Sequence, residues 1–213
     1  MAPDPAGKDD DGPALAGLCR RGAIFADVAT CAQTPSRSAR LPRSALDIGG
    51  HRGEDRAMSD DEAAVRERIV TAIDAYLSLL RDGAERQPTL SDLARALDDL
   101  VMVYHDTPDV GPDSDELGER VEERPLREQA SRAFPELGMY ALVEPEGGPD
   151  QQCGMSDAID DLAEIAVDLT EILWLFEHRS HNDAVWEFRL GYQSHWGRHL
   201  HELRIYLHAL AAW

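Results

Sequence analysis

Four acidic residues at regular spacing are the first feature of this chain that points to chemistry. They are Asp161, Glu164, Asp168 and Glu171. Their spacing of 3, 4 and 3 places them on one narrow strip of a helix with 3.6 residues per turn. Helical carboxylates facing a cleft hold Mg²⁺ or Mn²⁺ in enzymes that hydrolyse phosphate esters. The strip is therefore a candidate metal site.

Such a site also needs acids from a second helix, and no fixed spacing elsewhere in the chain pairs with the strip. The alternative is a solvated helix flank that meets Arg189 and Arg204 of the last helix. Arg189 falls within the apolar stripe of that helix, where a charge must be paired. We therefore expect Arg189 to form an ion pair with an acid of the preceding helix.

Histidines are concentrated near the C-terminus, six of the eight lying between residues 178 and 208. His195 and His199 are four residues apart, which lets two imidazoles reach one metal ion from one helix face. Glu202 shares this face and is a candidate third ligand. Because no glutamate of an HExxH motif lies between the histidines, the pattern favours polar residues on a helix flank over a metal site.

The charge balance excludes several partners. The 213 residues include 21 Lys and Arg against 41 Asp and Glu, a net charge of −20. Such a surface repels nucleic acid and anionic lipid. No apolar run approaches the roughly 18 to 20 residues of a membrane-spanning helix. The three cysteines form no disulfide framework, and we expect a reducing, cytoplasmic location.

The first 57 residues differ from the rest. They carry 8 basic and 8 acidic residues, together with 7 Gly and 5 Pro, and show no sustained apolar period. This composition predicts a disordered extension over residues 1–57. A helix opens directly after Met58, so we expect that the natural protein starts there and that residues 58–213 form one domain.

Helical periodicity dominates residues 58–213. Ser59 and Glu62 form a predicted capping box, and Ser91 and Asp92 a second cap. We expect helices over about 60–82, 91–107, 115–123 and 125–132, a short one from Pro135 through Leu142, and two long ones over 156–178 and 182–210, with a loop at 144–154. Gly197 inside the last helix indicates close packing beside Trp196. The sequence predicts an all-α bundle of five to seven helices.

The C-terminal helices resemble a known family. The run Asp160-Asp161-Leu162-Ala163-Glu164-Ile165 precedes Asn182-Asp183-Ala184-Val185-Trp186. The signature then continues through Arg189, Tyr192, Trp196, Gly197, Leu203 and Arg204. This pattern is similar to an uncharacterised bacterial family of helical proteins, domain of unknown function 5063, mainly over residues 156–208 and less over 59–145. The family's histidine three residues after its arginine is replaced here by Leu207, with His208 following. The resemblance implies a helical bundle and no activity.

The sequence favours a non-enzymatic, cytoplasmic helical module that binds a protein partner or itself and needs no cofactor. No phosphate-binding loop or nucleophile elbow is present in the sequence. The alternative is a divalent-metal-dependent phosphohydrolase that holds Mg²⁺ or Mn²⁺ on Asp161, Glu164 and Asp168.

Overall fold

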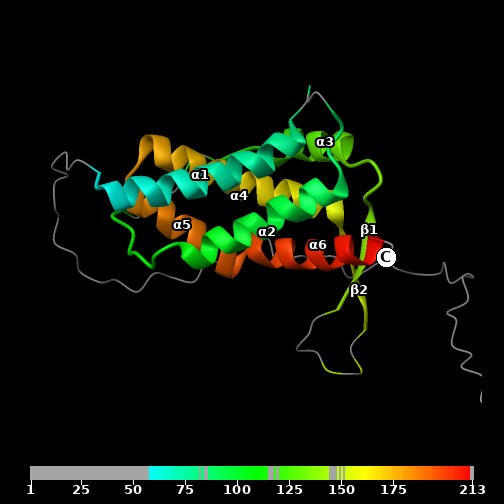
Figure 1. Ribbon diagram of the computed structural model, residues 1–213. Helices are drawn as coiled ribbons and strands as arrows, with labels where there is room; N and C mark the ends of the chain where they lie inside the picture. The colour runs from blue at the N-terminus through cyan, green and yellow to red at the C-terminus, as the bar shows by residue number, and fades with distance from the viewer. Residues whose placement is uncertain are drawn as a thin grey trace, which may run out of the picture. The chain divides into compact units, whose positions relative to one another are not determined.

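Helix α4 (Ala158–His178) is the element around which the others pack, as the computed structural model shows (Figure 1). It contacts α1 (Asp60–Leu80), α3 (Glu123–Ala133), α5 (His181–Ser194) and α6 (Trp196–Leu210), while α2 (Leu90–Asp106) packs on α1, α5 and α6. Apolar residues lie on nearly every side of α4, a pattern typical of a buried helix. Three acids of α4, Asp161, Asp168 and Glu171, are thereby buried, whereas Glu177 near its end is exposed.

The structure describes residues 58–81, 83, 86–114, 118, 120–143, 148, 150 and 152–211. The extension expected at residues 1–57 lies outside these ranges. Within them six helices are present, all in the compact unit Gly53–Trp213, so the predicted helical bundle is confirmed. No helix in the described ranges is long and apolar enough to cross a membrane.

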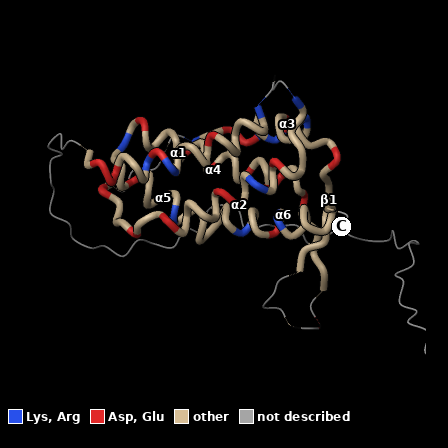
Figure 2. The backbone as a smooth tube through the Cα atoms, in the orientation of Figure 1, with Lys and Arg blue, Asp and Glu red and all other residues tan. Residues whose placement is uncertain are grey.

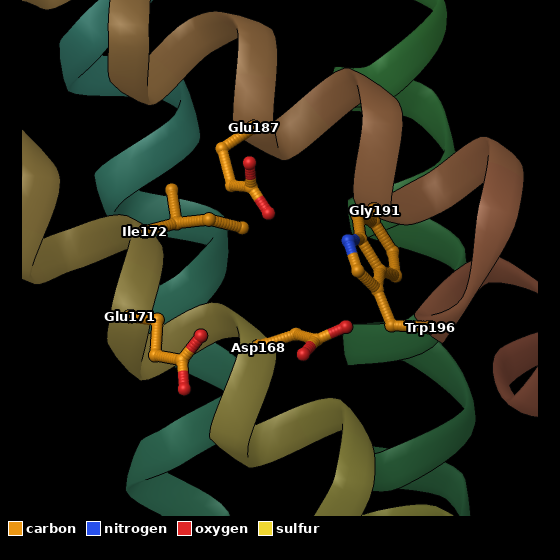
Figure 3. Close-up of a pocket in the computed structure, with 6 residues that line it drawn as sticks. All are labelled: Asp168, Glu171, Ile172, Glu187, Gly191 and Trp196. Atoms are coloured by element: carbon orange, nitrogen blue, oxygen red, sulfur yellow. The ribbon is translucent and has the colours of Figure 1, made fainter. Parts of the chain in front are cut away.

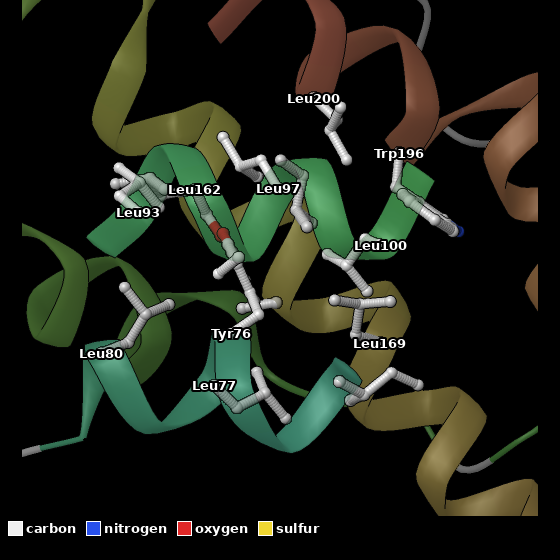
Figure 4. Packing of buried hydrophobic residues seen from close by; sticks show 14 of the residues in the cluster. Tyr76, Leu77, Leu80, Leu93, Leu97, Leu100, Leu162, Leu169, Trp196 and Leu200 are labelled. Atoms are coloured by element: carbon white, nitrogen blue, oxygen red, sulfur yellow. The ribbon is translucent and has the colours of Figure 1, made fainter. Parts of the chain in front are cut away.

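One apolar cluster joins the helices. Tyr76 and Leu80 of α1, Leu93 and Leu97 of α2, Leu162 and Leu169 of α4, and Leu200 of α6 converge in it (Figure 4). The Tyr76 hydroxyl donates to the Leu162 carbonyl at 2.9 Å, so this buried polar group is satisfied. Each such buried side chain contributes roughly 1.5–3 kcal/mol through the hydrophobic effect.

The first helix starts at its predicted cap, whereas the second starts two residues before the expected one. In α1 the Ser59 hydroxyl accepts from the Glu62 amide at 3.2 Å, and the Glu62 carboxylate accepts from the Ser59 amide at 2.7 Å. The α2 box is formed by Thr89 and Asp92, so α2 starts before the expected Ser91 cap. Of the helix expected over 115–123, residues 118 and 120–122 are described and are not helical.

Residues 139–157 contain a hairpin that the sequence did not predict. Strand β1 (Met139–Leu142) pairs antiparallel with β2 (Gly154–Asp157), and Tyr140 lies directly opposite Ser156. The short helix expected up to Leu142 is therefore wrong, because the spacing of Leu137, Tyr140 and Leu142 does not distinguish a turn followed by a four-residue strand from a helix. Figure 1 shows the hairpin at the end of the bundle where α6 ends.

The last predicted helix is in fact two. His195, at φ −148° and ψ −89°, ends α5 and precedes α6. At this break the Trp196 ring lies against Gly191, where a Cβ atom would come within 2.7 Å of the indole. A Cβ atom on Gly197 would come within 2.1 Å of the Tyr192 carbonyl oxygen. Gly197 is therefore required by the preceding helix of its own chain, not by a neighbouring helix beside Trp196.

Candidate metal site

The carboxylate strip of α4 faces the break between α5 and α6. Asp161, Asp168 and Glu171 are 2%, 7% and 9% exposed, and Glu164 is half-buried. The strip is therefore not a solvated flank. Because a buried carboxylate is costly unless paired, partners for these acids decide how the strip is used.

Two of the partners are the histidines that the sequence placed together. His195 Nδ1 lies 2.6 Å from Asp168 Oδ2, and His199 Nδ1 lies 2.9 Å from Asp161 Oδ1. A carboxylate accepts hydrogen bonds only, so both Nδ1 atoms carry a proton. The Nε2 atom of each ring is then the one available to another partner.

Glu164 completes a group of three potential metal ligands. Its Oε2 atom lies 2.8 Å from His199 Nε2. The imidazoles of His195 and His199 lie at 72° with their centroids 5.1 Å apart. One potential ligand atom from each of Glu164, His195 and His199 lies within 4.8 Å of the other two. Two nitrogen ligands and one oxygen ligand thus converge at the α4–α6 contact.

The surroundings of His199 favour the charged form of its imidazole. Burial lowers the pKa of its imidazole, but hydrogen bonds to Asp161 and Glu164 and the charges of these acids outweigh burial and raise the pKa to about 10. The same contacts therefore allow two states of the site: a partly buried imidazolium between two carboxylates, or a neutral imidazole that binds a metal ion beside Glu164.

A second group of potential metal ligands consists of Asp161, His199 and Glu202. Glu202, expected from the sequence as the third ligand of the histidine pair, lies in this group and also accepts from Arg198 at 2.7 Å. Asp161 is engaged by Tyr140 and Ser156 as well as His199. Because its donors already surround it, Asp161 is better suited to orient His199 than to bind a metal ion.

Glu171 lies apart from both groups. Its Oε1 atom accepts from the Val121 amide at 3.4 Å. Together with Asp168, Ile172, Glu187, Gly191 and Trp196 it lines a pocket of about 10 Å³ (Figure 3), room for about one water molecule. The Trp196 indole nitrogen, which Figure 3 shows facing this pocket, has no hydrogen-bond partner among the described residues.

The two arginines do not pair with the strip. Arg189 donates to the Thr107 carbonyl at 2.6 Å and to the Tyr104 carbonyl at 3.4 Å, at the end of α2. Its nearest acid is Asp109, at 3.7 Å, so the expected ion pair with the preceding helix is wrong. The Arg204 guanidinium forms a bidentate ion pair with Asp98 of α2. Its Nε atom lies 2.7 Å from Oδ1 and its Nη2 atom 3.0 Å from Oδ2.

The other signature residues pack at the break between α5 and α6 and in the apolar core. The Tyr192 ring stacks on Tyr104 at 3.8 Å, and its hydroxyl lies 2.7 Å from His201 Nε2. Leu203 and Trp196 are fully buried. Tyr192 of α5 thereby joins α2 to α6, and the buried Trp196 and Leu203 pack α6 into the core, which fixes the position of His199.

Comparisons with known proteins agree with this fold. The family described as "Domain of unknown function (DUF5063)" matches residues 60–212. The crystal structure of protein BF1032 from Bacteroides fragilis superimposes with a TM-score of 0.52 at 18% sequence identity. The match covers 72% of this chain and 94% of that one, and at this identity it shows the fold alone. No curated protein is similar enough to the chain to count as a match.

Proposed function

The chain belongs to the DUF5063 family, whose description assigns no function, and we propose that it is a metal-dependent hydrolase with Glu164, His195 and His199 as metal ligands. One observation carries the proposal: each histidine donates a hydrogen bond from its Nδ1–H group to an aspartate of α4, at 2.6 and 2.9 Å. Histidines that bind metals in proteins almost always donate their other ring N–H in this way, which fixes the ring and the tautomer.

The ligand set favours Zn²⁺ over the Mg²⁺ or Mn²⁺ expected from the carboxylates alone. Imidazole nitrogen suits Zn²⁺, whereas Mg²⁺ takes oxygen ligands. Two histidines and one glutamate leave a coordination position open, which is the arrangement of catalytic zinc sites. In this proposal Glu164 is a direct ligand, and Asp161 and Asp168 orient the two imidazoles.

The side chains define what the site can do. His195 and Glu164 are each 32% exposed, so water and a small substrate can reach the metal position. A metal ion held there lowers the pKa of a bound water and supplies a nucleophile near neutral pH. Acidic residues lie along the bundle (Figure 2) and repel large polyanions. We therefore propose hydrolysis of small phosphate monoesters.

The proposal is tested by stripping the full-length protein with a chelator and titrating it with Zn²⁺ in a calorimeter. We expect about one equivalent to bind, as for a three-ligand site. Glu164→Gln and His199→Ala should abolish this binding. Glu171→Gln is the matched control, because Glu171 is buried on the same strip but belongs to neither ligand group.

Hydrolysis of p-nitrophenyl phosphate is then measured with and without Zn²⁺. Activity that requires Zn²⁺ and is lost in Glu164→Gln supports the proposal. Failure of the wild-type protein to bind Zn²⁺, or equal binding by His199→Ala, would overturn it and leave the histidines as structural partners of buried acids.

Self-association is a second candidate function, supported by a different surface. Met139, Val143 and Met155 of the hairpin are 58%, 57% and 61% exposed. A second copy of this chain is the partner we propose for this apolar surface. Light scattering of the wild type should show a dimer that Met155→Glu dissociates; a wild-type monomer would contradict this proposal.

A further inference from the structure

The hairpin directs two hydroxyl groups at one carboxylate of the site. Tyr140 and Ser156 are opposite each other in the β1–β2 register, so their side chains project from the same face of the hairpin. The Tyr140 hydroxyl donates to Asp161 Oδ2 at 2.5 Å, and the Ser156 hydroxyl lies 3.3 Å from both oxygens of Asp161. Both polar side chains on the inward face of the hairpin thus form hydrogen bonds with Asp161.

Asp161, fixed by these two hydroxyl groups, in turn fixes the orientation of His199. Its side chain is 3% exposed, and its Oδ1 atom accepts from His199 Nδ1 at 2.9 Å. With donors on both oxygens, the carboxylate is held in one orientation. The direction of the His199 ring therefore depends on the hairpin, although Tyr140 is 59 positions away in the sequence.

A second contact fastens the hairpin to the helix that carries His199. The Tyr140 ring stacks on Tyr206 of α6, with centroids 4.7 Å apart and planes at 11°. Burial and the hydrogen bond to Asp161 raise the pKa of the Tyr140 hydroxyl, so it remains a donor across the physiological range. The stack and the hydrogen bond together fix the hairpin against both α4 and α6.

We propose that Tyr140 and Ser156 are positioning residues that hold Asp161 and, through it, His199 in the orientation that binds metal. The metal part of this inference rests on the proposed function. Hairpin docking and metal binding are then coupled, and the coupling is reciprocal: whatever factor the docked hairpin adds to metal affinity, the metal adds to hairpin docking.

The experiment compares Tyr140→Phe with Tyr76→Phe in the full-length protein. Both variants remove one buried phenol hydroxyl that bonds α4, but Tyr76 donates to the Leu162 carbonyl instead of the Asp161 carboxylate. A purely structural role predicts equal effects of the two substitutions on the site. Ser156→Ala is a milder variant in case Tyr140→Phe fails to fold.

Three measurements are made on each variant. We expect Tyr140→Phe to weaken Zn²⁺ binding by about 10- to 100-fold, as loss of a partner outside the ligand set does, and to change the visible spectrum of the Co²⁺ form. Zn²⁺ should slow hydrogen exchange of the hairpin amides in the wild type and less so in Tyr140→Phe. The proton NMR signal of the His199 Nδ1–H should shift or broaden in Tyr140→Phe and stay unchanged in Tyr76→Phe.

The outcomes separate the two proposals. Equal Zn²⁺ affinity and equal His199 signals in wild type and Tyr140→Phe would overturn this inference and leave the metal site standing. A wild type that binds no Zn²⁺ overturns the proposed function. In that case the His199 signal still decides whether the hairpin positions the Asp161–His199 pair.

Discussion

His199 is a partly buried imidazole whose two nitrogens both lie close to carboxylates, so its protonation contributes to the stability of the protein. The Nδ1 atom contacts Asp161 at 2.9 Å and the Nε2 atom contacts Glu164 at 2.8 Å. The charged form is favoured in the fold by these acids and has no such partners in the unfolded chain. The free energy of unfolding must therefore depend on pH.

The sign of that dependence follows from the direction of the pKa shift. The pKa of His199 is about 10 in the folded, metal-free protein and about 6.5 in the unfolded chain. Its stabilising contribution is complete below pH 6.5 and is lost as the pH rises through 10. Urea unfolding of metal-free protein at several pH values should show this loss, and subtracting the same series for His199→Gln isolates it. Parallel curves for the two proteins would contradict the prediction.

Asp168 is the residue on which the two interpretations of the strip differ most. An exposed acid on a body of charge −20 would lose little when neutralised, but Asp168 is 7% exposed and bonds His195 at 2.6 Å. We expect Asp168→Asn to lower the free energy of unfolding by about 1–3 kcal/mol. Zn²⁺ affinity should fall by about 10- to 100-fold. Chemical denaturation and Zn²⁺ competition with a chromophoric chelator measure the two effects, and unchanged values would show that Asp168 does not hold His195.

At the scale of the helices, the sequence predicted where α1 starts but not where the last predicted helix breaks into α5 and α6. The capping box of Ser59 and Glu62 marks α1 because those side chains act within four residues of one another. The α5–α6 break escaped prediction because the apolar spacing of 3 and 4 runs on through His195. Trp196 folds back onto α5 while Leu200 faces the same core. Only Gly197 indicated that something unusual happens there.

The break can be tested at Gly191. A Cβ atom at this position would lie 2.7 Å from the Trp196 ring. Because Trp196 is fully buried, we expect Gly191→Ala to lower the free energy of unfolding by about 1–3 kcal/mol through overpacking. Gly111→Ala is the control, since a Cβ there meets nothing within 4 Å. Thermal and urea unfolding measure both; equal stability of the two variants would indicate that the break relaxes around the new methyl group.

Across the complete chain, the sequence identified the acidic strip and the histidine pair, but it did not predict that the two are in contact in the folded protein. Spacing within one helix determines which residues share a face, whereas the partner of that face depends on the packing of all the helices. A usable signal was present: Ala163, Ala166 and Val167 make the other sides of α4 apolar. A helix that is apolar all round is buried, and its acids then need partners of their own.

Ligand binding should be visible in the stability of the entire fold. Zn²⁺ at 100 times its dissociation constant should add about 2.7 kcal/mol to the free energy of unfolding, which raises the melting temperature by several degrees. A chelator should reverse the shift, and His199→Gln should not show it. Mg²⁺ at the same concentration is the control, and an equal shift with Mg²⁺ would argue for an oxygen-only site.

The central position of α4 also has a consequence for how the protein is made. A ribosome releases α1 and α2 long before α4, since Leu80 and Ala158 are separated by 78 positions. At about 5–20 residues per second, roughly 4–16 s pass between the end of α1 and the start of α4. Until α4 is synthesised, the apolar faces of α1 and α2 can be covered only by each other and by α3. We therefore expect the nascent chain to expose apolar surface that chaperones can bind until its last third has been synthesised.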